Sequence, residues 1–313
     1  MKKIIYLLLI LFAAQGANAQ DIDKIITKDY VNRLIKTLSS DEMEGRATFS
    51  PGIDKAASFI ESEFKAIGLQ PLTGATGYRQ TFEQDGKSLF NVAGMIPGKS
   101  KAKELVIFSG HYDHLGIIKA SEGDSIANGA DDDASGTTAM IALAKYYKAL
   151  NNNERTLIFV AFTAEEIGGF GAKFFSQQLN PDDVTAMFNI EMIGKDSKFG
   201  KNTAFITGFD KSDFGKILQK NLAGTEFTFH PDPYPKQNLF YRSDNATLAA
   251  LGVPAHTIST DQIDTDKFYH TVKDEYETLD ADNILATIKG IAKSAISIIK
   301  GIDTPTRIPK LIE

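Results

Sequence analysis

The chain has 313 residues, of which 42% are hydrophobic and 24% are charged, and it contains 25 Gly, 10 Pro, no Cys and no Trp. This composition is that of a globular protein and excludes a collagen-like, low-complexity or mainly disordered chain. Without cysteine the chain forms no disulfide, thiolate zinc site or iron–sulfur cluster, so any metal must be bound by His, Asp and Glu.

The first 19 residues have the pattern of a secretory signal peptide. Lys2 and Lys3 precede an apolar run over residues 4–14, and residues 17–19 (Ala-Asn-Ala) form a small-x-small cleavage site. The run is too short to span a bilayer, and no Cys follows it for lipid attachment. We therefore expect an exported protein, periplasmic or secreted, without a membrane anchor.

Removal of this peptide takes away two lysines and no acidic residue, so the net charge shifts from −6 to −8. An acidic chain without clusters of Lys and Arg is a poor candidate for binding nucleic acid or an anionic membrane. We find no internal repeat or long linker. The sequence therefore predicts one domain over residues 20–313, with a helical part over 20–90 and a sheet core over 91–303.

Helix-period segments alternate with short apolar runs along the chain. The helical segments cover residues 29–38, 52–67, 135–150 and 281–300, and the last of these has an apolar stripe typical of core packing. The runs expected to be strands cover residues 105–109, 157–162, 187–190, 204–207 and 255–259. This alternation predicts a three-layer α/β sandwich, with a mostly parallel, mixed sheet between helices. Residues 225–238, with three prolines, are predicted to form a loop.

Imidazole or carboxylate side chains follow nearly every predicted strand. They are His111 and Asp113, the Glu165–Glu166 pair, Glu191 and His270, while Asp131, Asp132 and Asp133 open a helix. In open α/β sheets, ligands bind beyond the carboxyl ends of the strands, so these side chains should meet at one edge.

Several buried carboxylates at one edge need a cation, because an isolated buried carboxylate would otherwise take up a proton or unfold the site. A pair of divalent ions meets this need, and oxygen with imidazole ligands favours zinc. Asp113 is placed to hold His111 in one tautomer. Adjacent Glu165 and Glu166 diverge, so one can bind metal while the other faces water as a general base.

The motifs HYDHLG, GADDDASG, FTAEEIG, NIEMIG and YHT, in this order, resemble those of the co-catalytic dizinc aminopeptidases, metallopeptidase family twenty-eight. The stretch from Leu38 to Arg46 is also similar to that of many exported members. The resemblance implies the zinc-exopeptidase fold and hydrolysis of N-terminal residues from peptides with a free N-terminus. It also implies that zinc activates a water molecule whose proton is taken by a glutamate.

Carried over by motif, the resemblance assigns five zinc ligands and one base. His111 and Glu191 would bind one zinc ion, Asp132 would bridge both ions, and Glu166 with His270 would bind the second. Glu165 would be the general base. Glu191 stands where the family usually has Asp, and Asn245 stands where many members have a His that would otherwise be assigned to substrate binding.

The other histidines and acids near these motifs have simpler interpretations. We expect His114 to be a neighbour of the site rather than a ligand, and His230 and His256 to be structural. Asp131 and Asp133 are expected to cap a helix N-terminus. A final set, open to either a structural or a substrate-contacting role, comprises Tyr241, Arg242 and Asp244.

Two other functions are compatible with these motifs besides zinc-dependent peptide hydrolysis. Glutaminyl cyclases resemble this chain in several motifs but use a single zinc ion, and receptor- or scaffold-like descendants of the fold lose their ligands. The full ligand set together with Glu165 favours the peptidase. The sequence leaves open the preferred N-terminal residue, the oligomeric state, and aminopeptidase against dipeptidase or carboxypeptidase action.

Overall fold

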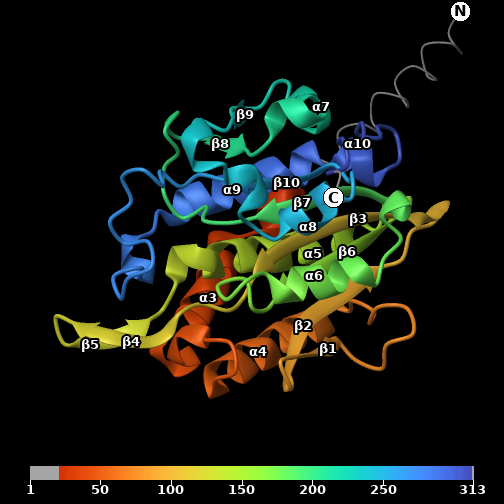
Figure 1. Cartoon of the computed structure of the whole chain (residues 1–313). Helices are drawn as coiled ribbons and strands as arrows, with labels where there is room; N and C mark the ends of the chain where they lie inside the picture. The colour runs from red at the N-terminus through yellow and green to blue at the C-terminus, as the bar shows by residue number, and fades with distance from the viewer. Residues whose placement is uncertain (1–20, 312–313) are drawn as a thin grey trace, which may run out of the picture.

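The computed structural model describes residues 21–311, and the predicted signal peptide over residues 1–19 lies outside this range. A central sheet crosses the molecule between layers of helices, and a small hairpin extends from its side (Figure 1). The order of the eight strands is β1 (Arg79–Gln84), β2 (Lys87–Ile96), β6 (Arg155–Phe162), β3 (Lys101–His111), β7 (Val184–Ile190), β10 (Ala255–Ser259), β8 (Thr203–Ile206) and β9 (Thr228–Pro231).

The four middle strands, β6, β3, β7 and β10, run parallel to one another. Strands β2 and β8 flank them in antiparallel pairings, and β1 and β9 form the two edges. Every residue of β6, β7 and β10 is buried, as expected for strands covered on both faces. The predicted mixed, mostly parallel sheet is therefore confirmed.

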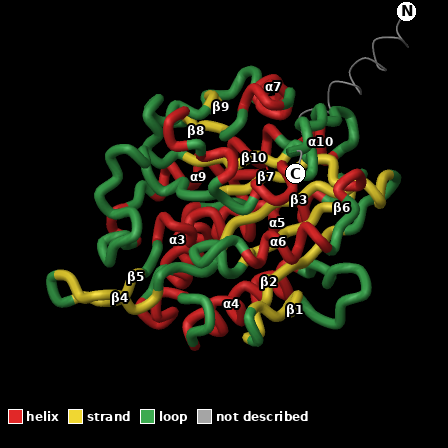
Figure 2. Tube along the Cα trace, in the orientation of Figure 1, coloured by secondary structure: helices red, strands yellow, loops and turns green. Residues whose placement is uncertain are grey.

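Helices cover both faces of the sheet (Figure 2). One face carries α6 (Phe170–Gln177) and α8 (Asn245–Ala250), which contact each other and the sheet. The other face carries the larger apolar core, formed with α3 (Lys28–Leu38), α4 (Pro51–Ile67), α5 (Gly136–Leu150), α7 (Phe214–Asn221), α9 (Ala281–Ser294) and α10 (Ile296–Ile299). The short α2 (Asp21–Ile25) contacts α5.

Aromatic side chains fill the centre of this larger core. The ring of Phe108 on β3 stacks on Phe159 of β6 at 5.5 Å and on Phe188 of β7 at 4.8 Å, and it meets Tyr147 of α5 at 5.3 Å. Such pairs stabilise the fold beyond their buried area. The packing fixes the relative positions of three adjacent strands whose carboxyl ends carry the residues described below.

Two sequence-based predictions are wrong in part. Residues 20–90 are not all helical, because β1 and β2 form a hairpin that extends the sheet from residue 79 onward. Residues 225–238 are not all loop, because residues 228–231 form the edge strand β9. Both β1 and β9 are edge strands with half-exposed, polar residues, so neither has the continuous apolar pattern of a buried strand.

The hairpin of β4 (Gly116–Ser121) and β5 (Asp124–Ala127) was also absent from the prediction, and it projects from the body of the protein (Figure 1). Within residues 21–311, none of the helices combines the length and the apolarity that crossing a bilayer would require.

Candidate metal centre

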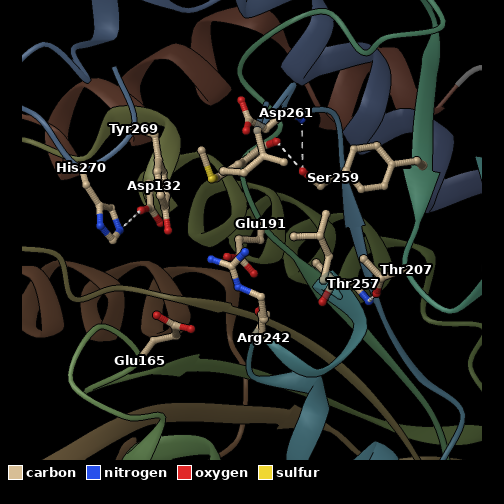
Figure 3. A pocket seen from close by; sticks show the side chains of 15 residues that line it. Asp132, Glu165, Glu191, Thr207, Arg242, Thr257, Ser259, Asp261, Tyr269 and His270 are labelled. Carbon is tan, nitrogen blue, oxygen red and sulfur yellow. Dashed lines mark hydrogen bonds and ion pairs between the residues drawn. The ribbon is translucent and has the colours of Figure 1, made fainter. Parts of the chain in front are cut away.

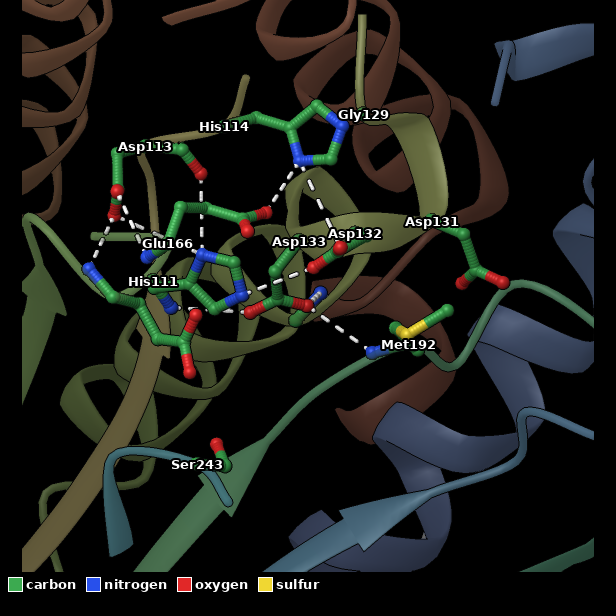
Figure 4. A network of polar contacts seen from close by, with 12 residues as sticks. His111, Asp113, His114, Gly129, Asp131, Asp132, Asp133, Glu166, Met192 and Ser243 are labelled. Atoms are coloured by element: carbon green, nitrogen blue, oxygen red, sulfur yellow. Dashed lines mark hydrogen bonds and ion pairs between the residues drawn. The ribbon is translucent and has the colours of Figure 1, made fainter. Parts of the chain in front are cut away.

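Most of the predicted site residues lie at the carboxyl ends of parallel strands. His111 is the last residue of β3 and pairs in register with Phe162, the last residue of β6. Glu165 and Glu166 follow β6, and Glu191 directly follows β7. Because these strands are neighbours in the sheet, their ends bring the three segments together. Figure 3 shows Glu165 with Glu191, and Figure 4 shows His111 with Glu166.

Asp132 lies at the centre of the site, on the irregular turn Ala130–Ser135 that precedes α5. A cis peptide bond joins it to Asp133. Its Oδ1 atom is 3.1 Å from Nε2 of His111, and its Oδ2 atom is 3.1 Å from Nε2 of His270. The two oxygens of one carboxylate thus face two different imidazoles, which is the arrangement of a bridging ligand.

Glu166 and Glu191 complete the two halves of this arrangement. Oε2 of Glu166 is 3.1 Å from Nε2 of His270. A carboxylate oxygen of Glu191 lies within 4.8 Å of ligand atoms of both His111 and Asp132. The longer side chain of Glu191, at a position that favours Asp in the resembling family, therefore reaches the site. All five residues predicted to bind zinc lie within this cluster.

Asp113 acts differently from the sequence-based prediction. The Nδ1 atom of His111 is 3.1 Å from the backbone carbonyl oxygen of Asp113, whereas the Asp113 carboxylate is 3.8 Å away (Figure 4). A carbonyl oxygen only accepts hydrogen bonds, so Nδ1 carries the hydrogen and Nε2 keeps its lone pair. The backbone of residue 113, rather than its side chain, sets this tautomer.

The carboxylate of Asp113 instead holds the turn that carries the two glutamates. Its Oδ1 accepts a hydrogen bond from the backbone N–H of Glu165 at 3.1 Å, and its Oδ2 accepts one from Glu166 at 3.3 Å and one from the Thr48 hydroxyl at 3.1 Å. Ala164, just before the turn, has a left-handed backbone with φ of 60°. This strained turn separates the two glutamate side chains.

His114 lies deeper in the site than a simple neighbour. Its Nδ1 is 2.8 Å from Oε1 of Glu166 and 3.7 Å from Oδ2 of Asp132. Its ring is fully buried, and its Nε2 has no hydrogen-bond partner among the described residues. The contact occupies one oxygen of Glu166 and leaves the other facing His270.

The two outer acids of the Asp131–Asp133 run have separate roles. Asp133 does cap α5, because its Oδ1 accepts from the backbone N–H of Gly136 at 2.9 Å, and its Oδ2 accepts from His111 at 3.1 Å. Asp131 caps no helix: its Oδ1 accepts from the backbone N–H of Gly194 at 2.7 Å. The prediction of a cap was therefore wrong for Asp131.

The electrostatics of the cluster favour positive charge among the carboxylates. Burial raises the pKa of Asp132, but contacts with His111 and His270 outweigh burial and hold it well below its usual range. Contacts with Asp132 and Glu166 raise the pKa of His270 to about 10. The site thus binds positive charge at the positions where the two imidazoles face the carboxylates.

Glu165 stands apart from these ion pairs. Burial is the main cause that raises its pKa to about 10, and the charges of Glu191 and Asp244 contribute, against the lowering effect of His111. Asp244 is buried with neither carboxylate oxygen hydrogen-bonded to a described residue, and burial raises its pKa to about 8. A dication nearby would lower both pKa values, because it favours the charged carboxylates.

The donor set fits zinc. Nε2 of His111 is buried, carries a lone pair and accepts no hydrogen bond from a described residue. Ligand atoms of a tetrahedral zinc ion lie about 3.3 Å from one another, given bonds of about 2.0 Å. The separations of 3.1 Å between imidazole nitrogens and carboxylate oxygens are close to that value. These residues therefore offer the donor atoms and spacings that a zinc ion requires.

A pocket of about 600 Å³, including its open mouth, adjoins this cluster (Figure 3). Asp132, Glu165, Glu191 and His270 form one side of it. The other walls combine apolar side chains, hydroxyl groups and two charged side chains: Met192, Phe205, Thr207, Leu239, Arg242, Ser243, Thr257, Ser259, Asp261, Ile263 and Tyr269. Arg242 therefore lines the pocket, whereas Tyr241 is a partly exposed side chain outside its lining.

Asn245 and His256 are structural. The side-chain amide of Asn245 donates to the carbonyl oxygens of Phe240 and Ala255 and accepts from the hydroxyl of Thr257, all in the interior. Both ring nitrogens of His256 are hydrogen-bonded at 2.8 Å within the core. His230, which lies in β9, stacks on Phe199 with 4.0 Å between the ring centroids.

One buried residue of this region was missed by the sequence reasoning. The carboxylate of Asp274 accepts from the backbone N–H groups of Asp131 at 2.9 Å and Asp132 at 3.0 Å. It joins the segment of His270 to that of Asp132. An acid four residues after a predicted ligand was the only signal for it in the sequence.

Comparison with known proteins gives a family match and several relatives. The model of Peptidase family M28 matches residues 91–295. Leucine aminopeptidase 1 of Pyrenophora tritici-repentis is 30% identical over 210 residues, which are 62% of this chain and 52% of that protein. The chain spans from 37% to 63% of the length of the curated relatives considered.

Solved structures match the fold at low sequence identity. The zinc aminopeptidase BSAP of Bacillus subtilis superposes with a TM-score of 0.71 at 13% identity, covering 88% of this chain and 95% of that one. Glutaminyl cyclase of Porphyromonas gingivalis superposes with a TM-score of 0.67 at 15% identity, covering 87% and 99%. These likenesses establish the sandwich fold, which supports more than one chemistry.

Proposed function

Because the chain belongs to peptidase family M28, we propose that it is a zinc-dependent aminopeptidase that binds two zinc ions and removes N-terminal residues from peptides. The observation that carries this proposal is the position of Asp132, whose two carboxylate oxygens face His111 and His270 at 3.1 Å each. A carboxylate between two imidazoles suits a pair of ions that share it.

The residues divide into two ligand sets and a base. His111, Glu191 and Asp132 would hold one zinc ion, and Asp132, Glu166 and His270 the other. When bound, zinc acidifies a water molecule and polarises the carbonyl group of the peptide bond to be cleaved. Glu165, which lines the pocket and is not part of either ion pair, would take a proton from the attacking water and pass it to the leaving amine.

The charge and the shape of the pocket favour binding of the free N-terminus of a peptide. The free α-amine of a peptide is a cation, and the acidic rim of the pocket attracts it. The adjoining walls, with Phe205, Leu239 and Ile263, suit an apolar side chain of the N-terminal residue. Peptides with a blocked N-terminus lack the charge that this rim would bind.

Two alternatives share the fold and differ in metal content and chemistry. A glutaminyl cyclase-like enzyme would hold one zinc ion and cyclise N-terminal Gln, and a scaffold descendant would bind no zinc. The presence of both imidazoles together with Glu166 and Glu191 favours two ions.

A panel of aminoacyl-anilides and dipeptides, assayed with chelator and with added zinc, tests the proposal. We expect zinc-dependent cleavage and about two zinc ions per chain. N-terminally acetylated peptides, as the matched control substrates, should be resistant. One tightly bound zinc ion with cyclisation of Gln, and no cleavage, would instead favour the cyclase.

Replacing the base tests its role. Glu165→Gln should lower kcat about 100- to 10,000-fold, the usual contribution of a general base, while the zinc content stays at the wild-type level. The control is Glu63→Gln. It removes a carboxylate on α4, away from the site, that pairs with Arg33 of α3 at 2.8 Å. Wild-type turnover by Glu165→Gln would contradict the assignment.

We also propose that the protein is exported and that cleavage follows Ala19. The support is the charged start, the apolar run and the small residues of the first 19 positions. Mass spectrometry of the secreted or periplasmic protein should find an N-terminus at Gln20. An intact N-terminus on protein recovered from the cytoplasm would contradict export.

A further inference from the structure

Beneath the site lies a buried cation to which the proposed function gives no role. Arg46 ends the 3-10 segment Asp41–Arg46, and its side chain is completely inaccessible to solvent. Burying an arginine is unfavourable unless its guanidinium N–H groups find acceptors. The identity of those acceptors indicates what the residue does.

The guanidinium donates to carbonyl oxygens on three separate segments. Nε donates to Tyr112 at 2.8 Å, Nη1 donates to Leu38 and Asn128 at 2.6 Å each, and Nη2 donates to Gly129 at 2.9 Å. Tyr112 directly follows His111, and Gly129 precedes Asp132 by three residues. One side chain therefore ties together the segments of two predicted ligands.

The backbone around Arg46 reinforces this connection. The carbonyl oxygen of Arg46 accepts from the backbone N–H of His114 at 3.2 Å, and the Thr48 hydroxyl donates to the Asp113 carboxylate at 3.1 Å. Residues 46–48 thus run alongside residues 112–114.

The chain adopts a costly conformation to bring Arg46 to this position. Three consecutive residues have left-handed backbones, with φ of 51° at Glu44, 64° at Gly45 and 53° at Arg46. A Cβ atom on residue 45 would lie 2.5 Å from the carbonyl oxygen of Ala127 and 2.7 Å from Gly116, so only glycine fits there. Strain of this kind persists where the surrounding structure requires it, and often at functional sites.

The charge of Arg46 also bears on the site. Its guanidinium forms no ion pair within 4 Å in the described part of the chain, yet it interacts through space with Asp274, Asp132 and Asp113. It is a fixed positive charge behind the acidic cluster.

We propose that Arg46 is a positioning residue that sets the spacing between His111 and Asp132. It thereby sets the affinity for zinc of the site that these two residues would form. The inference rests on the proposed function, because it concerns the same metal centre. Its basis is that one buried guanidinium donates hydrogen bonds to the backbone of both segments that carry these residues, at Tyr112 on one and at Asn128 and Gly129 on the other.

A second buried arginine provides a matched control. Arg155 is also inaccessible to solvent, and it donates to Glu104 at 2.6 Å and to the carbonyl oxygens of Ile298 at 2.6 Å and Asp303 at 2.7 Å. It is the first residue of β6, at the end of the sheet opposite the metal centre. Its loss should destabilise the fold without moving a ligand.

The experiment compares Arg46→Met, Arg46→Lys and Arg155→Met with the wild type. Zinc is titrated by calorimetry into each folded, metal-free protein, and cobalt(II) absorption spectra report the ligand geometry. Arg46→Met should bind zinc about 10- to 100-fold more weakly at one site, the range seen when partners of metal ligands are removed. Its cobalt spectrum should change. Arg46→Lys keeps the charge but not the four-acceptor geometry, so its affinity should be intermediate.

Arg155→Met should show a lower unfolding temperature with wild-type zinc affinity and cobalt spectrum. Wild-type zinc affinity in folded Arg46→Met, or in Arg46→Lys if the Met variant does not fold, would overturn the inference and leave the proposed function standing. Equal loss of affinity in Arg155→Met would overturn it too, since the effect would then be one of stability. A wild-type chain that binds no zinc would overturn both proposals.

Discussion

His111 and His256 differ in whether both ring nitrogens are hydrogen-bonded to other groups of the protein. Nδ1 of His111 is held by a carbonyl oxygen, and its Nε2 faces Asp132 with a lone pair. Both nitrogens of His256 are used within the core, by the carbonyl oxygen of Thr207 and the hydroxyl of Ser212. The first histidine can therefore bind metal, and the second can only stabilise the fold.

His256 should make the free energy of unfolding depend on pH. Burial lowers its pKa to about 4, below the unfolded value, so the unfolded chain binds more protons between these two pKa values. The stability that depends on the neutral ring is complete above about pH 6.5 and is lost as the pH falls toward 4. Between pH 7 and pH 5 the loss should be about 2 kcal/mol.

Urea unfolding of the metal-free protein at these two pH values, for wild type and His256→Gln, measures this contribution. The variant should be less stable at pH 7 and should lose about 2 kcal/mol less than the wild type on going to pH 5. Burial also lowers the pKa of the half-buried His230, but far less than that of His256, so His230→Gln should change the pH dependence by less than His256→Gln does. Identical pH slopes for wild type and His256→Gln would refute the prediction.

The positions of His111, Glu166 and Glu191 were predictable because they end or follow strands whose carboxyl ends meet at one edge of the sheet, whereas Asp132 and His270 were predicted from the family motifs. What could not be predicted were contacts between distant segments. The use of the Asp113 carbonyl in place of its carboxylate depends on the turn at Glu165. Arg46 and Asp274 act through backbone groups 66 to 143 positions away along the chain. No local pattern marks such partners.

At the scale of elements, the strands and helices that could be predicted from the sequence were mainly those that are buried. Strand β10 has the predicted bounds, and α5 begins one residue later than expected, because both have strong apolar patterns. The short helices α6, α7 and α8 and the half-exposed strands β1 and β9 have weak patterns and were not predicted. Their positions are set by packing against the rest of the fold.

The N-terminus of α9 depends on one side chain. The Asp280 carboxylate accepts from the backbone N–H groups of Asp282 at 2.9 Å and Asn283 at 3.1 Å. Asp280→Ala should lower the free energy of unfolding by about 1 kcal/mol, as measured by urea denaturation. Asp282→Ala removes only an exposed carboxylate paired with Lys28, so its cost should be at most about 0.5 kcal/mol. A larger cost for Asp282→Ala than for Asp280→Ala would show that the cap is not the source of the effect.

At the scale of the whole molecule, the metal centre connects segments from along the chain. Its predicted ligands come from residues 111 to 270, and α3 and α9 pack in the same core as the central strands of the sheet. Binding of an ion to these ligands therefore favours the folded state as a whole. The family match over residues 91–295 includes all five predicted ligands and Glu165.

Removing zinc should lower the unfolding temperature. At free zinc 100-fold above its dissociation constant, each occupied site would contribute about 2.7 kcal/mol. Thermal unfolding in chelator and in graded zinc concentrations measures this effect. Asp132→Asn, which alters the carboxylate between both imidazoles, should unfold at a temperature that no longer responds to zinc. A wild-type unfolding temperature that is unaffected by zinc would contradict the prediction.

The two imidazoles of the centre differ in their contact with solvent: the His111 side chain is 1% exposed, and that of His270 is 37% exposed. His270 also lies on a surface segment rather than at the end of a central strand. The two ions would therefore not be equivalent in lability. The one beside His270 would be the last to load and the first to dissociate, so mild dialysis should yield half-loaded protein rather than a mixture of full and empty chains.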